Sequence, residues 1–259
     1  MFKKTIPEHN IYRKDISVSE IIETINIGWQ KALKFVEYSQ SEDKNLELKP
    51  EYLITVKIAD SIVENLIVNP VSNFSLILEG KTSDAYERRK SEINLTITKN
   101  RIVEYIFRKK SDSNIRKGKF DIVLYKKEYL AGSDQYRTYS VIEVKNIKFS
   151  NRQLMLDILR INEIIKTNNN SDNYQLNYGI LTFSEKVKKD LAIRMLFCND
   201  SLTEIEKLVE NRKLKYHQKL DLKENMSIET FVMKNKIENE DCYTLSDLYI
   251  IYNVVINGT

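Results

Sequence analysis

The sequence predicts an α/β fold in which a central mixed β-sheet is flanked by helices. Its 259 residues are 42% hydrophobic, which suffices for one large core or for a core with an appended subdomain. Only 3 Pro and 6 Gly are present, so the composition is unlike that of a disordered or linker-rich chain. The spacing of apolar residues changes from helical to alternating and back, which indicates helices packed on a sheet.

Two helices are expected before the first strand. Ser17 and Glu20 form a capping box, and the apolar residues that follow predict a helix from about residue 18 to 37. The polar connector SQSEDKNLELKP separates it from a second helix. This second helix begins near Glu51, carries a broad apolar face and ends before Pro70.

The centre of the chain is rich in residues that favour strands. Five runs, separated by polar or glycine-containing joints, predict a meander of strands. The runs are FSLILEG, EINLTITK, IVEYIFRK, FDIVLYKK and YSVIEVK. Helical spacing returns in NRQLMLDILRINEIIKT, and YQLNYGILTF is expected to add one more strand.

The last part of the chain favours helices. We expect them in SEKVKKDLAIRMLF and SLTEIEKLVENRKLKYHQKL, and a final helix around LSDLYIIYNVVI. The segment between about residue 219 and that final helix has no clear period. We therefore divide the chain into an N-terminal helix and connector (1–49), a core (50–200) and a C-terminal helical extension packed on the core (201–259).

The composition excludes several classes of function. Cys198 and Cys242 are too few for a disulfide framework and match no zinc spacing, which fits a reducing compartment. With only His9 and His217, the chain lacks the histidines of most zinc hydrolases and of HNH nucleases. There is no G-x-x-x-x-G-K-[ST] phosphate loop and no apolar signal core, so we expect a soluble cytoplasmic protein that is not an NTPase motor.

One strand places an acid and a base inside an apolar run. In VIEVK, residues 141–145, side chains alternate across the strand, so Glu143 and Lys145 share one face. Ile142 and Val144 point to the other face and can pack on a helix. Asp121, in the preceding strand FDIVLYKK, can approach the same point if the two strands are neighbours. Two carboxylates and a lysine would then converge.

Such a cluster has a chemical use. Carboxylate oxygens bind a hard divalent cation such as Mg²⁺, whose other ligands are water and phosphate oxygens. A bound metal activates a water and neutralises negative charge in the transition state of phosphodiester hydrolysis. Lys145 could orient or deprotonate that water and stabilise the same charge. The cluster therefore indicates metal-assisted hydrolysis of a phosphodiester.

These residues resemble the motif of a known superfamily. Asp121, followed after about twenty residues by Glu143-Val144-Lys145 in the element order αβββαβ, resembles the PD-(D/E)xK nucleases, which have the restriction endonuclease-like fold. The resemblance implies that Asp121 and Glu143 bind the metal and that the carbonyl of Val144 is a further ligand. It assigns Lys145 the role of positioning the water.

The resemblance covers roughly residues 50–200, the nuclease-like core of our division. Phe120 stands where the family motif has its proline, which leaves the metal chemistry untouched. Families of this fold often add an acid from the first core helix, and Glu51 and Glu64 are the candidates for it. Glu87 is a third candidate, and the sequence does not choose among the three.

Candidate contacts to nucleic acid lie on both sides of the motif. A basic cluster surrounds the strand that carries Asp121, and the helix after Lys145 offers further polar groups. From these we select Arg116, Lys117, Lys119, Arg152, Gln153 and Arg160. The basic cluster would equally suit a solvated hairpin edge. The pair Asp157 and Arg160 would equally suit an ordinary intrahelical ion pair.

The E-x-K triplet alone is weak, because the polar connector contains two more, EDK at 42–44 and ELK at 47–49. Only Glu143 combines an apolar strand, a preceding acid-bearing strand and a following helix. Without a site, Glu143 and Lys145 would be solvated or paired across strands at a sheet edge.

The resemblance implies a Mg²⁺-dependent deoxyribonuclease, with Mn²⁺ as a substitute metal, that acts on duplex DNA. An endonuclease of restriction or anti-phage defence is the role that the family makes most natural, and a homodimer or a partner subunit would supply a second site. The alternative is a nucleic-acid-binding or complex-assembly subunit that keeps the nuclease fold without cutting.

Overall fold

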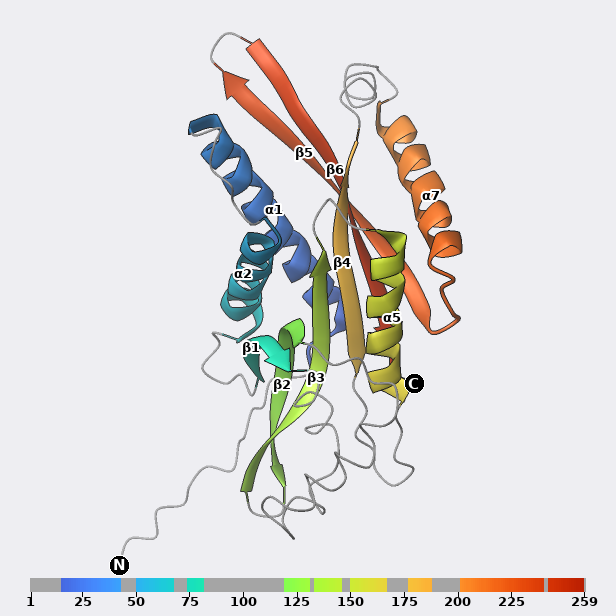
Figure 1. Ribbon diagram of the computed structural model, residues 1–259. Coiled ribbons are helices and arrows are strands. Elements are labelled where there is room, and N and C mark those ends of the chain that lie inside the picture. Colours follow the sequence, from blue (N-terminus) through green and yellow to red (C-terminus); the bar gives the residue numbers. More distant parts are fainter. Residues whose placement is uncertain are drawn as a thin grey trace, which may run out of the picture.

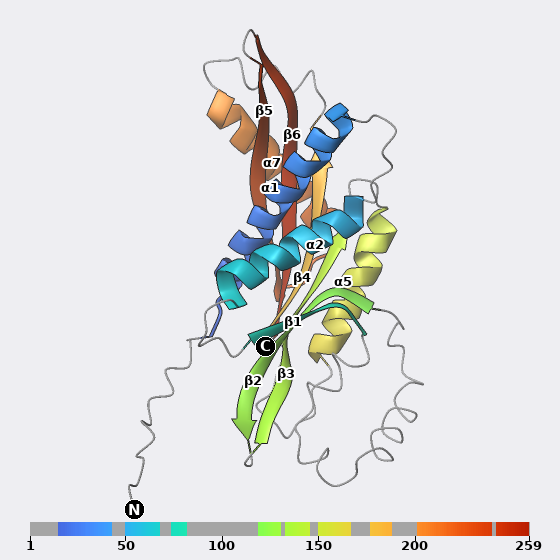
Figure 2. The same ribbon diagram turned by 90° about the vertical axis from the view of Figure 1, so that its left-hand side faces the viewer.

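The fold is α/β, with a six-stranded mixed sheet between two layers of helices. The computed structural model describes residues 15–42, 50–67, 74–81, 119–130, 133–145, 150–166, 177–187, 201–239 and 242–258. Figures 1 and 2 show α1 (Val18–Glu42) and α2 (Pro50–Ile62) on one face of the sheet, and α5 (Asn151–Lys166) and α7 (Ser201–Lys219) on the other. The expectation of a mixed sheet flanked by helices is confirmed.

The strand order in the sheet is β1-β2-β3-β4-β6-β5. Strands β1 (Phe74–Lys81), β2 (Lys119–Leu130) and β3 (Ser133–Lys145) pair antiparallel. After β3 the chain crosses over through α5 and returns as β4 (Tyr178–Lys186), which pairs with β3 in parallel. Strands β5 (Met226–Asn239) and β6 (Cys242–Asn257) form a hairpin, and β6 pairs antiparallel with β4.

Alternation along the strands produces a hydrophobic core on each face of the sheet. The core beneath α5 and α7 takes Val141 from β3, and the core beneath α1 and α2 takes Ile142 and Val144. At Val141 and Ile142, just before Glu143, strand β3 is therefore apolar and buried on both faces. A strand buried on both sides can present a polar side chain only where the helices leave room for it.

The N-terminal helices are built as expected. The Ser17 amide and hydroxyl donate to the Glu20 carboxylate, and the Glu20 amide donates to the Ser17 hydroxyl oxygen, which confirms the capping box. Helix α2 continues into a π-helical turn, Val63–Ile67. Trp29 of α1 is fully buried, and its Nε1 donates to the Thr182 hydroxyl of β4 at 2.8 Å. This bond ties the first helix to the middle of the sheet.

The C-terminal segment is where the expected fold was wrong. Residues 201–219 are helical, but the final helix expected around residues 245–256 is strand β6, and the supposed helical extension instead completes the sheet. Ile250 and Tyr252 face one core while Ile251 faces the other, so both faces of β6 are apolar. The sequence of β6 therefore does not show the alternation of apolar and polar residues that identifies a half-buried strand. The β-branched and aromatic residues were the remaining signal.

Several expected elements lie outside the described residues. These are the strands EINLTITK and IVEYIFRK, and the expected helix SEKVKKDLAIRMLF after residue 187. The first three residues of that segment, 184–186, belong to β4 rather than to a helix. Within the described ranges, no helix has the length and apolar character needed to cross a membrane.

Helices α1 and α2 approach closely at Gly28. A Cβ at this position would lie 2.4 Å from the Cα of Ile58, a backbone atom that cannot rotate away. Alanine is intrinsically about 1 kcal/mol better than glycine in a helix. We nevertheless expect Gly28→Ala to lower the free energy of unfolding by about 1–3 kcal/mol, because overpacking outweighs propensity.

Chemical denaturation measures this difference. The control is Glu23→Ala on the exposed face of α1, which should change stability by no more than about 0.5 kcal/mol. Equal stability of the two variants would mean that α1 and α2 are not in contact at Gly28.

Candidate active site

The candidate site begins where β2 and β3 stop pairing. Their ladder ends at Ile122 opposite Ile142, while β3 continues to pair with β4 as far as Lys145. Beyond the ladder, Asp121 Oδ2 accepts a hydrogen bond of 2.7 Å from the backbone N–H of Val144. The carboxylate of one strand thus replaces the missing ladder bond to the other, which holds Asp121 next to the E-V-K triplet.

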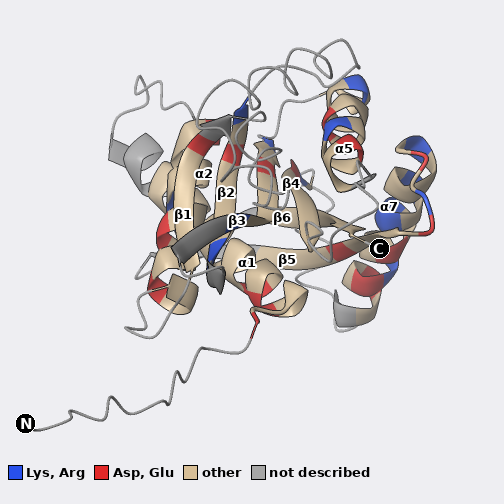
Figure 3. Cartoon of the chain, turned by 90° about the horizontal axis from the view of Figure 1, so that it is seen from below, with Lys and Arg blue, Asp and Glu red and all other residues tan. Residues whose placement is uncertain are grey.

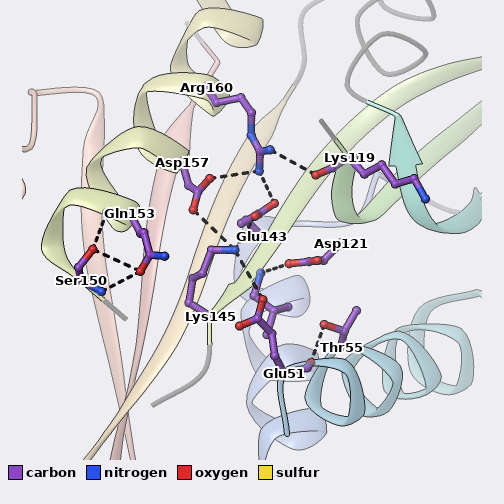
Figure 4. Close-up of polar contacts among 11 residues, drawn as sticks. Glu51, Thr55, Lys119, Asp121, Glu143, Lys145, Ser150, Gln153, Asp157 and Arg160 are labelled. Atoms are coloured by element: carbon purple, nitrogen blue, oxygen red, sulfur yellow. Dashed lines mark hydrogen bonds and ion pairs between the residues drawn. The ribbon is translucent and has the colours of Figure 1, made fainter. Parts of the chain in front are cut away.

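Glu143 and Lys145 project from the same face of β3, toward α5, as the alternation predicts (Figure 4). Lys145 Nζ donates to Glu143 Oε1 at 2.7 Å. On the other side of the glutamate, Arg160 Nη2 of α5 lies 2.5 Å from Glu143 Oε2. This second contact is an electrostatic pair whose atoms lack the alignment of a hydrogen bond. Each oxygen of Glu143 therefore faces a cation.

Asp157 closes these contacts into a ring of four charges. Its Oδ1 lies 3.3 Å from Arg160 Nη2, and its Oδ2 lies 3.6 Å from Lys145 Nζ. Positive and negative groups alternate around the ring. We call Glu143, Lys145, Asp157 and Arg160 the ion-pair ring. The ring joins β3 to α5 through three buried charged residues and through Lys145, whose side chain is 16% exposed.

Two further carboxylates face the ring from outside it. Oε1 of Glu51, at the start of α2, lies 3.8 Å from Lys145 Nζ. Asp121 is close enough to Lys145, Glu51 and Arg160 for their charges to affect its pKa. The ring itself is neutral when all four members are ionised. Asp121 and Glu51 then leave an excess of negative charge beside it, which a cation would offset.

Burial controls the protonation of this cluster. Desolvation, with the nearby charge of Asp121 as a second cause, raises the pKa of Glu143 from 4.5 to about 7. Desolvation also raises the pKa of Asp121, against the hydrogen bond from Val144. For Lys145, desolvation lowers the pKa, but the carboxylates around it, led by Glu143, outweigh burial and the net direction is upward. Lys145 is consequently a cation at neutral pH.

The structure distinguishes among the candidates for the additional acid. Glu51 reaches the cluster, whereas Glu64 pairs with Lys31 of α1 at 2.6 Å on an exposed surface. Glu87 lies outside the described residues. Of the two acids that can be compared, only Glu51 therefore belongs to the site. The reason is its place in the first turn of α2, next to the end of β3.

The candidate nucleic-acid contacts fall into three groups. Lys119 and Arg152 are exposed, and Gln153 is exposed while its amide oxygen caps α5 through Ser150. Arg160 is only 5% exposed, which contradicts the prediction that it contacts nucleic acid directly. Arg116 and Lys117 lie outside the described residues. For the exposed residues, nucleic-acid binding stays a prediction.

Asp157, which completes the ring, was not among the residues that the sequence motif assigned to the site. A signal was present in the sequence: Asp157 and Arg160 lie at the i, i+3 spacing on a helix face otherwise made of Leu154, Ile158 and Ile161. Two opposite charges on an apolar face indicate a buried polar network. The same spacing on a solvated face would have meant an ordinary surface pair.

Acidic and basic residues are mixed along helix α7. Figure 3 shows positions of Lys and Arg interspersed with positions of Asp and Glu along its ribbon. Next to the site, the exposed Lys119 side chain pairs with Glu79 of β1 at 2.7 Å.

The fit of a divalent metal can be judged from the donors. Asp121 and Glu143 offer hard oxygen ligands, and desolvation raises the pKa of both carboxyl groups although Lys145 and Arg160 lie near them. In the described ranges, no group of three or more His, Cys, Asp or Glu side chains is arranged to surround a metal ion. By chemistry and charge, the donor set fits Mg²⁺, an ion that keeps several waters and needs only one or two carboxylates.

Comparisons with protein-family models, with curated proteins and with solved structures found no match to this chain.

The raised pKa of Glu143 makes stability depend on pH. Between about pH 4.5 and 7 the folded protein holds this proton while the unfolded chain releases it. The stabilisation is complete below about pH 4.5 and is lost as pH rises through 7, by at most about 3 kcal/mol. Glu143→Gln should remove this slope from the free energy of unfolding measured against pH. A profile unchanged by the substitution would show that Glu143 titrates normally.

Proposed function

We propose that the protein is a Mg²⁺-dependent nuclease that hydrolyses phosphodiester bonds of DNA and acts as an endonuclease. The observation that carries the proposal is the convergence of Asp121, Glu143 and Lys145 from two neighbouring strands, with both carboxylates desolvated. Desolvated carboxylates beside a charged lysine are costly to fold around. A catalytic site explains that cost, because it needs perturbed groups in one place.

The residues divide the work by their positions. Asp121 and Glu143 would hold the metal, with Glu51 as the outer acid on the side of α2. Bound Mg²⁺ would supply an activated water and charge neutralisation at the phosphate. The raised pKa of Lys145 keeps its ammonium protonated, so we assign it the roles of orienting the water and stabilising negative charge, and not that of a general base.

DNA as the substrate and defence against foreign DNA as the role follow from the resemblance to the PD-(D/E)xK nucleases, and both are part of the proposal. Cleavage of the second DNA strand would require a second active site, supplied by another copy of the chain or by a partner subunit.

One observation favours the alternative, a non-cleaving nucleic-acid-binding or assembly subunit. Both oxygens of Glu143 already face cations, so the ion-pair ring offsets the charge of this carboxylate without a metal. A purely structural network would look the same. The two functions differ in what metal does: only the nuclease requires it.

Cleavage assays test the nuclease directly. With Mg²⁺ or Mn²⁺ on plasmid and linear DNA, Asp121→Asn, Glu143→Gln and Lys145→Gln should each lower kcat by about 100-fold or more, since each removes a group acting on the reacting phosphate. Glu51→Gln should cost less, because Glu51 lies at the edge of the cluster. Glu64→Gln, an exposed acid near the end of the same helical segment, is the control and should leave cleavage intact. Equal cleavage by all five variants would exclude this site as the catalytic centre.

Metal binding can be tested without any substrate. Mg²⁺ competes with protons for Asp121 and Glu143, so its stabilisation of the fold should be larger at pH 8 than at pH 6. At a metal concentration 100 times Kd the gain is about 2.7 kcal/mol, measured as a shift in Tm. The double variant Asp121→Asn/Glu143→Gln should lose the shift, and Glu64→Gln should keep it. A shift that persists in the double variant would place the metal elsewhere.

A further inference from the structure

Helix α5 carries two charged residues into the protein interior. Asp157 is 4% exposed and Arg160 is 5% exposed, on the face that also buries Leu154 and Ile158. Taking an ion out of water costs several kcal/mol unless it is paired and hydrogen-bonded. A helix that needs only to pack would carry apolar residues at both positions, so these two charges call for a reason beyond packing.

Arg160 connects the strands that carry the two acids. Besides its contact with Glu143 of β3, its Nη1 donates to the backbone carbonyl oxygen of Lys119 at 3.3 Å. Its guanidinium also lies 4.6 Å from the centre of the Phe120 ring. Lys119 and Phe120 immediately precede Asp121 on β2. One planar side chain thus contacts both strands at the point where their own pairing has ended.

Asp157 balances the two cations of the ring. It lies between Arg160 and Lys145, the residues that face the two oxygens of Glu143. Loss of Asp157 would remove the carboxylate that Arg160 and Lys145 share and would change the charge around Glu143. The i, i+3 spacing of Asp157 and Arg160 on α5 therefore places both side chains against Glu143 and Lys145 of β3.

We propose that Asp157 and Arg160 are positioning residues of the active site, which hold Glu143, Lys145 and the strand end next to Asp121 in their working arrangement. This inference rests on the proposed nuclease function. Both residues would act through Glu143 and Lys145, without touching the substrate or the metal. Outer residues that orient ligands in this way typically change metal affinity or activity by 10-fold to 100-fold when they are replaced.

The experiment compares Arg160→Met, Arg160→Lys and Asp157→Asn in the full chain. Two quantities are measured: the affinity for Mn²⁺ in the absence of DNA, by calorimetry, and kcat and KM for DNA cleavage. We expect Arg160→Met to weaken Mn²⁺ binding and to lower kcat, each by about 10-fold to 100-fold, with KM for DNA nearly unchanged. Arg160→Lys should recover part of both losses, because it keeps the charge but not the planar fork.

Arg212→Met is the matched control. Arg212 pairs with Glu185 at 2.5 Å, the same distance as Arg160 from Glu143, but between α7 and β4. Its replacement should lower Tm and leave Mn²⁺ affinity and kcat at the wild-type level. If Arg160→Met behaves in the same way, with reduced Tm alone, Arg160 is structural and the proposal is overturned. A rise in KM at constant kcat would overturn it in favour of a contact to DNA.

The outcomes also separate this inference from the proposed function. Wild-type protein that cuts DNA, with Arg160 and Asp157 variants that bind Mn²⁺ and cut equally well, would refute the positioning role alone. Wild-type protein that binds Mn²⁺ but cuts no substrate would refute the nuclease, while weaker Mn²⁺ binding by the variants would still support their positioning role. Should Arg160→Met fail to fold, Arg160→Lys and Asp157→Asn carry the same comparison.

Discussion

The burial of one carboxylate, Glu143, is the constraint on which the rest of the site depends. An ionised glutamate cannot be shielded from water without partners, and here the partners come from its own strand and from α5. Lys145 is forced to the same face by strand geometry, and Arg160 by the packing of α5 on that face. Asp157 follows, because two cations around one carboxylate need a second anion.

The sheet and the two helical layers meet at this point for a topological reason. Strand β3 leaves β2 after Ile142 and continues beside β4, so its last residues are accessible from both layers. Helix α5 supplies the inner charges, and the first turn of α2 supplies Glu51. Asp121 spans the opening by accepting the N–H of Val144. An acid-rich edge beside a neutral ring is the result, and it has the charge that a divalent cation offsets.

Much of this arrangement could be anticipated from local patterns. The capping box at Ser17, the alternation in VIEVK and the helical spacing after residue 150 each depend on near neighbours in the chain, and each is realised in the structure. The final strand could not be identified in this way. Its residues 248–256 are buried on both faces, and a run that is apolar apart from Asn253 has no period that separates strand from helix.

Alternation and consecutive strands were enough to predict the α/β class, the shared face of Glu143 and Lys145, and the approach of Asp121 on a neighbouring strand. That Glu51 and not Glu64 reaches the cluster became visible only in the folded chain. The folded structure alone turned Arg160 from a surface cation into the inner partner of Glu143. Both outcomes depend on how α2 and α5 lie on the sheet. The apolar helix face around Asp157 and Arg160 indicated burial, but the spacing of residues along one helix does not say which strand residue the arginine meets.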